Sequence, residues 1–201
     1  EPLMREDVTE IVRNIKSDNP EIANVLADSV ITSGRWKGQR LTGGAVVSPE
    51  LSFDGKEILF AYAKPAYSGD NRPWEYTEEN SFHIFKVNVD GSHLVQLTEG
   101  NYNDFDPCYL PNGRIAFVST RTTGRGIGPI YPRCFPDRAP QQHFLHSMKA
   151  DGSDIIPLSY HETDEWNPSV TNDGRIVYTR WDYVDRNSNA AQHLWTCYPD
   201  G

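Results

Sequence analysis

Short runs in which apolar and polar residues alternate recur along the chain from residue 41 onward, and Asp-Gly or Asn-Gly dipeptides join them in pairs. A period of two is typical of half-buried β-strands, and both dipeptides tolerate the positive φ angles of a tight hairpin turn. The pattern therefore predicts a chain built mainly of antiparallel hairpins.

The hairpins recur as a larger unit. The first half of the unit begins at a proline and reaches a glycine six residues later, and the prolines at positions 49, 107 and 168 give a period of 58 to 61 residues. Each unit predicts four antiparallel strands, named A to D in chain order. The first halves cover residues 49–60, 107–117 and 168–178, and the second halves, which run from a histidine through Asp-Gly, cover 83–98, 143–159 and 193–201.

A four-stranded sheet cannot cover its own two faces, so repeated sheets of this kind are expected to stack around an axis as the blades of a β-propeller. A sandwich of similar hairpins is the alternative, but it does not require a four-strand unit to recur at a fixed period. We therefore expect an all-β chain whose main part is a β-propeller.

The expected propeller is partial. Residues 45–201 hold about 2.6 units, whereas closed propellers have roughly 4 to 8 blades. The third unit stops after its C strand, and residues 38–42 resemble the D strand of a blade whose earlier strands lie elsewhere. We expect blades over 38–201, incomplete at the C-terminus, whose open C strand at 193–198 needs further blades or a protein partner.

Residues 1–37 show a different pattern. Apolar residues within 6–17 have the i, i+3, i+4, i+7 spacing of an amphipathic helix. Asn19-Pro20 then resembles the N-cap and first position of a second short helix over 22–26. This predicts a short N-terminal helical segment and linker, whose apolar face packs on its own domain or docks another protein.

The repeat resembles the TolB-like, WD-repeat-like propeller blade, whose signature is a proline, a Ser-x-Asp-Gly turn, an Ile-x-Phe strand, and a strand ending in Asp-Gly-Ser and Leu-Thr; the match covers about residues 40–201. Within this group, the strings at 103–117, 158–170 and 173–186 resemble the propeller region of hydrazine synthase alpha-subunit-like proteins. The resemblance implies an exported protein, periplasmic or secreted, of a family in which many members have haem domains beside the propeller. The sequence has no CxxCH motif, so neither haem nor redox chemistry is implied for this chain.

The charge pattern excludes some classes of partner. The net charge is −9 and no Lys/Arg cluster interrupts the acidic background, so nucleic acid is not expected as a partner. No apolar run approaches the roughly 20 residues of a membrane span. The chain opens at Glu1 with neither Met nor a leader, which indicates a processed or shortened chain.

Strand parity sorts the loops of the expected blades between two ends. The A–B and C–D turns share one end, here called the short-turn end, and the B–C and D–A connections share the other, here called the long-connection end. Binding residues usually lie on long loops of a rigid scaffold. Aromatic side chains beside arginines and carboxylates suit a polar ligand or a protein partner, or they pair internally and fill gaps between blades. The candidate binding residues at this end are His161, Asp164, Trp166, Arg180, Trp181, Asp182, Tyr183, Asp185 and Arg186.

Other chemistry is less well supported by the sequence. Asn101, Asn103, Asp104 and Asp106 offer alternating oxygen atoms that suit Ca²⁺, but the glycine and distal glutamate of an EF-hand are missing. Strand alternation places the histidines at 143 and 146 on opposite faces of a sheet, which argues against a joint metal site.

The cysteines at 108, 134 and 197 form no CxxC pair; isolated structural thiols, one disulfide with a free thiol, and a metal or reactive role stay open. No nucleophile elbow, phosphate loop, dinucleotide fingerprint or HExxH motif is present. We expect no metal, no cofactor and no catalytic residue in this chain.

The expected function is that of a β-propeller binding or assembly module of an exported protein. Its partner is either a protein or the remaining blades, with a small polar ligand as a further option at the long-connection end. The alternative is the propeller portion of an enzyme. That enzyme is either a hydrazine synthase alpha-like redox protein or a hydrolase, with its haem or catalytic domains outside this chain.

Overall fold

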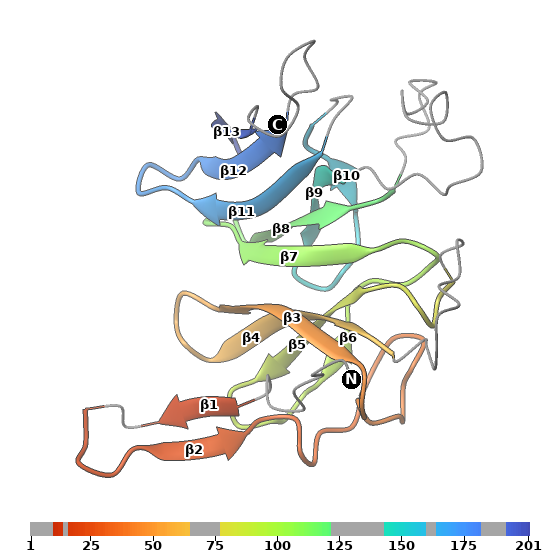
Figure 1. Cartoon of the computed structure of the whole chain (residues 1–201), viewed down its shortest axis with the longest axis vertical. Coiled ribbons are helices and arrows are strands. Elements are labelled where there is room, and N and C mark those ends of the chain that lie inside the picture. The colour runs from red at the N-terminus through yellow and green to blue at the C-terminus, as the bar shows by residue number, and fades with distance from the viewer. Residues whose placement is uncertain (1–9, 14–15, 65–76, 122–142, 160–163, 182–191) are drawn as a thin grey trace.

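The computed structural model describes residues 10–13, 16–64, 77–121, 143–159, 164–181 and 192–201. Within these ranges the chain forms β-strands in four antiparallel sheets and no helix (Figure 1). In the same ranges no helix is long and apolar enough to cross a membrane.

Three of the sheets are the repeated units, and neighbouring strands pair in chain order. The all-β, partial propeller architecture is therefore confirmed. The D strands are shorter than expected, because the residues before them belong to the C–D turns. Blade 1 contains β3 (Ala45–Leu51), β4 (Glu57–Ala63), β5 (His83–Asn88) and β6 (Val95–Gln96); blade 2 contains β7 (Asp104–Tyr109), β8 (Arg114–Ser119), β9 (Phe144–Lys149) and β10 (Ile156–Pro157); blade 3 contains β11 (Glu165–Val170), β12 (Ile176–Trp181) and β13 (Gln192–Cys197).

The A strands of the blades lie next to one another, with β7 between β3 and β11 (Figure 1). Apolar side chains fill the space between successive blades, because alternate residues of a strand face opposite sides of its sheet. Leu59 and Ile84 of blade 1 meet Phe117 of blade 2. Leu145 of blade 2 belongs to a second cluster with Tyr178 of blade 3. Blades 1 and 2 thus each bury one face of their sheet against the following blade.

The predicted N-terminal helices are wrong. Residues Glu10–Arg13 form β1 and Glu21–Asn24 form β2, which pair as an antiparallel hairpin. The helical spacing spanned only two turns, which is too short to stabilise an isolated helix. Its apolar positions are β-branched valines and isoleucines, which lose rotamer freedom in a helix and favour strands.

The segment that follows β2 covers the outer face of blade 1. Val25, Ile31 and Trp36 are buried in one cluster with Phe60 and Phe85 of the blade. Trp36 packs against Phe85 with a centroid distance of 5.8 Å. This segment therefore occupies the side of blade 1 that faces away from blade 2.

The predicted D strand at 38–42 is also wrong. The backbone N–H of Gly38 donates to the carbonyl oxygen of Ile31 at 2.8 Å. The backbone N–H of Ile31 in turn donates to the carbonyl oxygen of Gln39 at 2.9 Å. These bonds close a local loop, so the groups that a strand ladder would use are already engaged. Instead, Ser33 forms a parallel bridge with Val95 and covers the outer edge of β6.

The A strands of the three blades share a backbone feature, a bulge before the repeat proline. Ser48, Asp106 and Asn167 each precede the repeat proline and have φ angles of 53°, 50° and 50°. Each lies where the register of its A strand shifts against the B strand. A residue before proline is normally extended, and a non-glycine residue at positive φ is uncommon. The same strained bulge therefore recurs in all three described blades.

The side chain of Asp106 connects these bulges. Its Oδ1 accepts a hydrogen bond from the hydroxyl of Ser48 in blade 1. Its Oδ2 accepts the backbone N–H of Asn167 in blade 3 at 3.0 Å and the side-chain amide of Asn167 at 3.3 Å. One carboxylate therefore fixes the inner strands of three successive blades.

The C–D turn of each blade contacts the segment before that blade. Gly152 of blade 2 has a φ of 86°, and a Cβ at this position would collide with the carbonyl oxygen of Leu97 in blade 1. A Cβ on Gly91 of blade 1 would lie 2.6 Å from the carbonyl oxygen of Val25. Val25 thus takes the place that Leu97 has for the following blade, so the N-terminal segment replaces a preceding D strand.

Replacing Asp106 by alanine should destabilise the fold by about 2 kcal/mol, because hydrogen bonds to a charged group are lost at both neighbouring blades. Urea unfolding followed by tryptophan fluorescence measures the change. Asp54 is a suitable control, since its carboxylate bonds only within its own exposed turn. Equal losses for Asp106→Ala and Asp54→Ala would contradict the inter-blade role.

Gly152→Ala should cost clearly more stability than Gly113→Ala. Gly113 has a φ of 81° and open space where a Cβ would be, so alanine there should cost about 1 to 2 kcal/mol through backbone strain alone. At Gly152 the same strain is joined by the collision with Leu97. Thermal unfolding of the two variants gives the comparison, and equal melting temperatures would rule out close docking of this turn.

Candidate functional site at the long-connection end

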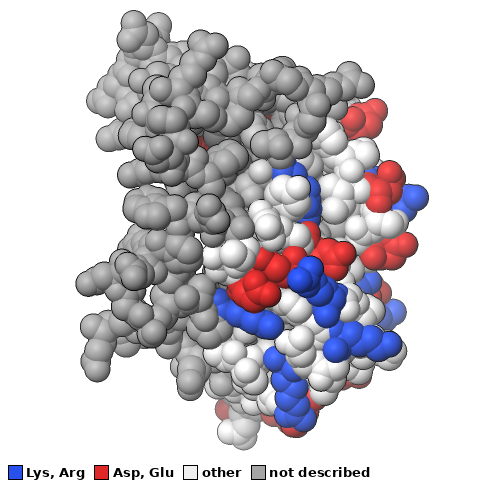
Figure 2. Space-filling model, turned by 90° about the vertical axis from the view of Figure 1, so that its right-hand side faces the viewer, with Lys and Arg blue, Asp and Glu red and all other residues white. Residues whose placement is uncertain are grey.

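The described strands confirm the sorting of loops between two ends. In Figure 1 the B strand β8 ends, and the A strand β7 begins, at the same side of blade 2. Figure 2 views this side directly and shows acidic and basic side chains next to one another across its described part. Charged side chains of both signs therefore lie next to one another on this face of the described structure.

Asp164, Trp166, Arg180 and Trp181 lie together at this end of blade 3. The register pairs Glu165 with Arg180 across β11 and β12. The N–H of Trp181 donates to the carbonyl oxygen of Asp164 at 2.9 Å. The other candidate binding residues lie outside the described residues: His161, Asp182, Tyr183, Asp185 and Arg186.

Arg180 lies between an acidic and an aromatic group of its own blade. Its guanidinium carbon is 4.5 Å from the ring centroid of Trp195, a cation–π contact. Glu165 is fully buried, and burial raises the pKa of its carboxyl, while its bonds from Ser159 and Leu145 and the charge of Arg180 act in the opposite direction. Arg180 therefore interacts with Trp195 and Glu165 of its own blade.

Asp164 and Trp166 both meet His143, which stands just before β9 of blade 2. The carboxylate of Asp164 accepts the backbone N–H of His143 at 2.9 Å, and its Oδ1 is 3.5 Å from the imidazole Nδ1. The rings of His143 and Trp166 are 6.4 Å apart, and Phe105 packs on the other side of His143 at 5.0 Å. These residues join blades 2 and 3 at the long-connection end.

Blade 2 has a buried ion pair at the corresponding place. Asp104 is fully buried and corresponds to Glu165 in the repeat. Its Oδ2 is 2.6 Å from the guanidinium of Arg121, and its Oδ1 accepts the hydroxyl of Ser119 at 2.6 Å. Burial raises the pKa of the Asp104 carboxyl, and Arg121 opposes this effect. Arg121 also lies over the ring of Tyr102 at 4.6 Å.

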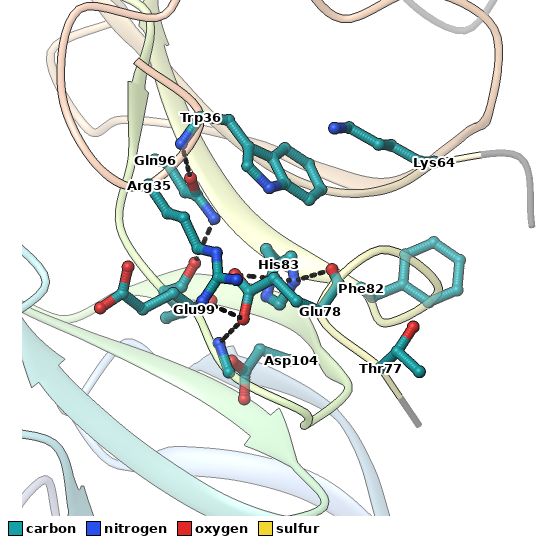
Figure 3. A network of polar contacts seen from close by, with 12 residues as sticks. Arg35, Trp36, Lys64, Thr77, Glu78, Phe82, His83, Gln96, Glu99 and Asp104 are labelled. Carbon is teal, nitrogen blue, oxygen red and sulfur yellow. Dashed lines mark hydrogen bonds and ion pairs between the residues drawn. The ribbon is translucent and has the colours of Figure 1, made fainter. Parts of the chain in front are cut away.

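Blade 1 adds a second buried group, shown in Figure 3. Glu78 lies in the connection before β5, and its Oε2 accepts the N–H of Gly100 at 2.5 Å and lies 3.9 Å from Arg35. The imidazole Nε2 of His83 donates to the carbonyl oxygen of Glu78 at 2.8 Å, and Trp36 meets the imidazole edge-on at 5.3 Å. A carboxylate and an imidazole are thus buried side by side under an exposed arginine.

Three polar atoms of this group have no hydrogen-bond partner in the described structure. They are Oε1 of Glu78, Nδ1 of His83 and Oγ of Ser81, and all three residues are at most 4% exposed. Buried polar groups in proteins are nearly always hydrogen-bonded, so such atoms call for an explanation. The Glu78 group is therefore a candidate site at the long-connection end.

Sequence reasoning did not select Glu78, His83 or Arg121 as site residues. The carboxylates Asp104 and Glu165 both stand three residues before the repeat proline, and that shared position was a detectable signal. Glu78 lies in a connection without repeat or periodicity, so no signal was available for it.

The suggested Ca²⁺ ligands do not converge. Asn103 accepts the N–H of Phe82 at 2.9 Å, Asp104 is paired with Arg121, and Asp106 is bound at the inner strands. Among the described residues, no three His, Cys, Asp or Glu side chains are grouped as metal ligands.

Two of the cysteines are free thiols with little reactivity. Burial raises the pKa of the Cys108 thiol to about 12 and that of Cys197 to about 11, so both are protonated at neutral pH. Cys134 lies outside the described residues.

Comparison with known proteins gives limited matches. No family model matches the chain. It is 32% identical to dipeptidyl-peptidase 5 of Porphyromonas gingivalis in an alignment of 115 residues that covers 50% of this chain and 16% of the peptidase.

Solved structures with a similar fold include TolB of Acinetobacter baumannii, at 14% identity and a TM-score of 0.47, and a putative TolB of Agrobacterium tumefaciens, at 15% identity and a TM-score of 0.47. The match covers 94% of this chain in both, with 38% of the first protein and 84% of the second. The chain thus spans a minor part of the peptidase and of the first TolB. The propeller assignment here rests on the strand order and blade stacking described above.

The stability of the fold should fall between pH 7 and pH 4 because of His146. Burial lowers the pKa of this imidazole to about 4 from an ordinary 6.5. The unfolded chain therefore binds a proton that the folded chain does not, and up to about 3 kcal/mol is lost as the pH falls through this window. Because Phe85 occupies the same register position in blade 1, phenylalanine is a suitable replacement for His146.

Urea unfolding of the wild type and His146→Phe at pH 7 and pH 4.5 measures this effect. The variant should lose less stability than the wild type on acidification. Identical losses in the two proteins would show that His146 is not responsible.

Proposed function

We propose that this chain is a β-propeller binding and assembly module of an exported protein, periplasmic or secreted, and that it binds at the long-connection end. Its own residues supply recognition and not catalysis. The occupant is a protein partner or a small polar ligand. The buried pair of Glu78 and His83, whose Oε1 and Nε2 atoms are 3.7 Å apart, and the exposed Arg35 beside it are the observation on which this proposal rests.

The energetic argument concerns unmet hydrogen bonds. A buried polar atom without a partner costs about 1 to 3 kcal/mol. An occupant that donates to Glu78 Oε1 removes part of that cost, and it reaches this atom only when Arg35 moves aside, because Glu78 is 4% exposed. Arg35 lies beside the carboxylate with its side chain 59% exposed, so the approach from solvent passes this residue. The site therefore favours a polar occupant with hydrogen-bond donors.

Blade 3 supports the assembly part of the proposal. Its strand β13 has an edge without a neighbouring strand in the described structure, and Leu194 and Trp195 on it are 77% and 40% exposed. In blade 2 the corresponding strand pairs with β10 at His146 and Ser147. The residues of β13 at the equivalent positions are Trp195 and Thr196. We therefore expect a strand from further blades or from a partner to pair with β13 at these two residues.

A second candidate is that these blades form the propeller portion of an enzyme whose catalytic domain is separate from them. The observation in its favour is the 32% identity with dipeptidyl-peptidase 5, which suggests a peptidase. The redox form of this alternative, a hydrazine synthase alpha-like protein with separate haem domains, rests on the motif resemblance alone.

Charge reversal at the two ends of the blades tests the first proposal. Arg35→Glu changes an exposed arginine at the long-connection end, and Lys56→Glu changes an exposed lysine of the A–B turn at the short-turn end. The tagged full-length protein is cross-linked in its own cells, and bound proteins and small molecules are quantified by mass spectrometry. We expect Arg35→Glu to reduce the principal bound species at least tenfold and Lys56→Glu to leave it unchanged.

Equal recovery with both variants would contradict binding at the long-connection end. The same preparations are assayed for release of dipeptides from peptide substrates. Activity that is unaffected by Arg35→Glu would favour the second candidate.

A further inference from the structure

A pocket of about 580 Å³ lies far from the long-connection end, between the outer edge of blade 1 and the C–D turn of blade 2. Val95 and Leu97 of the blade 1 edge supply apolar surface. Asp151 of the neighbouring turn lies opposite. Its volume is within the range of pockets that bind small molecules.

An ion pair is fixed in the wall of this pocket. The ammonium of Lys86 is 3.0 Å from Oε1 of Glu57, and their side chains are only 19% and 35% exposed. The hydroxyl of Tyr109 in blade 2 donates to Oε2 of Glu57 at 3.4 Å. His93 also lines the pocket, and its imidazole is 3.2 Å from the side-chain amide of Asn88. A positive and a negative group are therefore held next to each other at known positions.

The same place in blade 2 is built differently. By strand register, Arg114 corresponds to Glu57 and Ser147 corresponds to Lys86. The guanidinium of Arg114 donates to the Ser147 hydroxyl at 3.0 Å, to Oδ2 of Asp154 at 2.9 Å and to its carbonyl oxygen at 2.7 Å. One side chain thus connects strands B and C with the C–D turn. In blade 1 no arginine stands at this position, and the ion pair of Glu57 and Lys86 borders an open volume instead.

We propose that the blade 1 pocket binds a small zwitterion of the size of a free amino acid with an apolar side chain. A carboxylate on the ligand fits beside Lys86 and His93, an ammonium fits beside Glu57 and Asp151, and the apolar group fits against Val95 and Leu97. The carboxylate and the ammonium of a zwitterion can each face the opposite charge of the Glu57–Lys86 ion pair. A ligand with a single charge is attracted by one of these two residues and repelled by the other. This site is separate from the proposed function at the long-connection end.

Titration with L-leucine tests the proposal on the intact chain. Amide shifts in two-dimensional NMR locate the binding, and the probes are L-leucine, N-acetyl-L-leucine, which lacks the ammonium, and L-leucinamide, which lacks the carboxylate. We expect shifts at 93–97 and 150–152 with a dissociation constant of about 1 mM or lower. Each derivative should bind at least tenfold more weakly.

Variants at equivalent positions supply the control. Glu57→Gln and Lys86→Met should weaken L-leucine binding at least tenfold. Arg175→Met should leave it unchanged, because Arg175 follows the turn glycine of blade 3, pairs with Asp173 of its own turn and does not line the pocket. Three results would overturn the proposal: equal binding of L-leucine and both derivatives, shifts confined to residues that do not line the pocket, or no shift at an L-leucine concentration of about 50 mM. The mapping uses the wild-type chain, so it decides the question even if a variant fails to fold.

Discussion

The hydrogen bonds of Asp106 are the interaction on which the arrangement of the blades depends. The residue before each repeat proline is held at positive φ, so that its side chain and backbone N–H turn toward the neighbouring A strands. A single carboxylate then receives donors from the blade before it and the blade after it. Hydrogen bonds to a charged group are strong enough to offset the strain of a left-handed residue.

The two ends of the blades use charge in different ways. At the long-connection end, Asp104 and Glu165 are fully buried, and an arginine reaches each from a different position: Arg121 after β8 and Arg180 within β12. Glu78 differs from both, because the arginine next to it, Arg35, is 3.9 Å away and has a side chain that is 59% exposed. At the short-turn end, charges mainly stabilise turns, as where Asp90 accepts the N–H of Ser92 at 2.9 Å. The short-turn end and the long-connection end thus differ in how deeply their charged groups are buried.

Differences between blades are as informative as the repeat. Gly91 packs on Val25 where Gly152 packs on Leu97, so a non-repeated segment completes the first blade. Arg114 spans its blade where Glu57 and Lys86 leave a pocket. Such departures occur where the repeat alone does not require a given side chain.

The sequence by itself determined the four-strand unit, its period and the end at which Asp164, Trp166, Arg180 and Trp181 meet, because strand alternation and Asp-Gly turns are local properties. It did not determine the N-terminal hairpin, since Ile11 and Val12 fit a helical spacing as well as a strand. Nor did it reveal Glu78, whose environment is made by Arg35, His83 and Gly100 from separate segments. Only the tertiary structure decided which charges are buried, since burial depends on contacts between residues far apart in the chain.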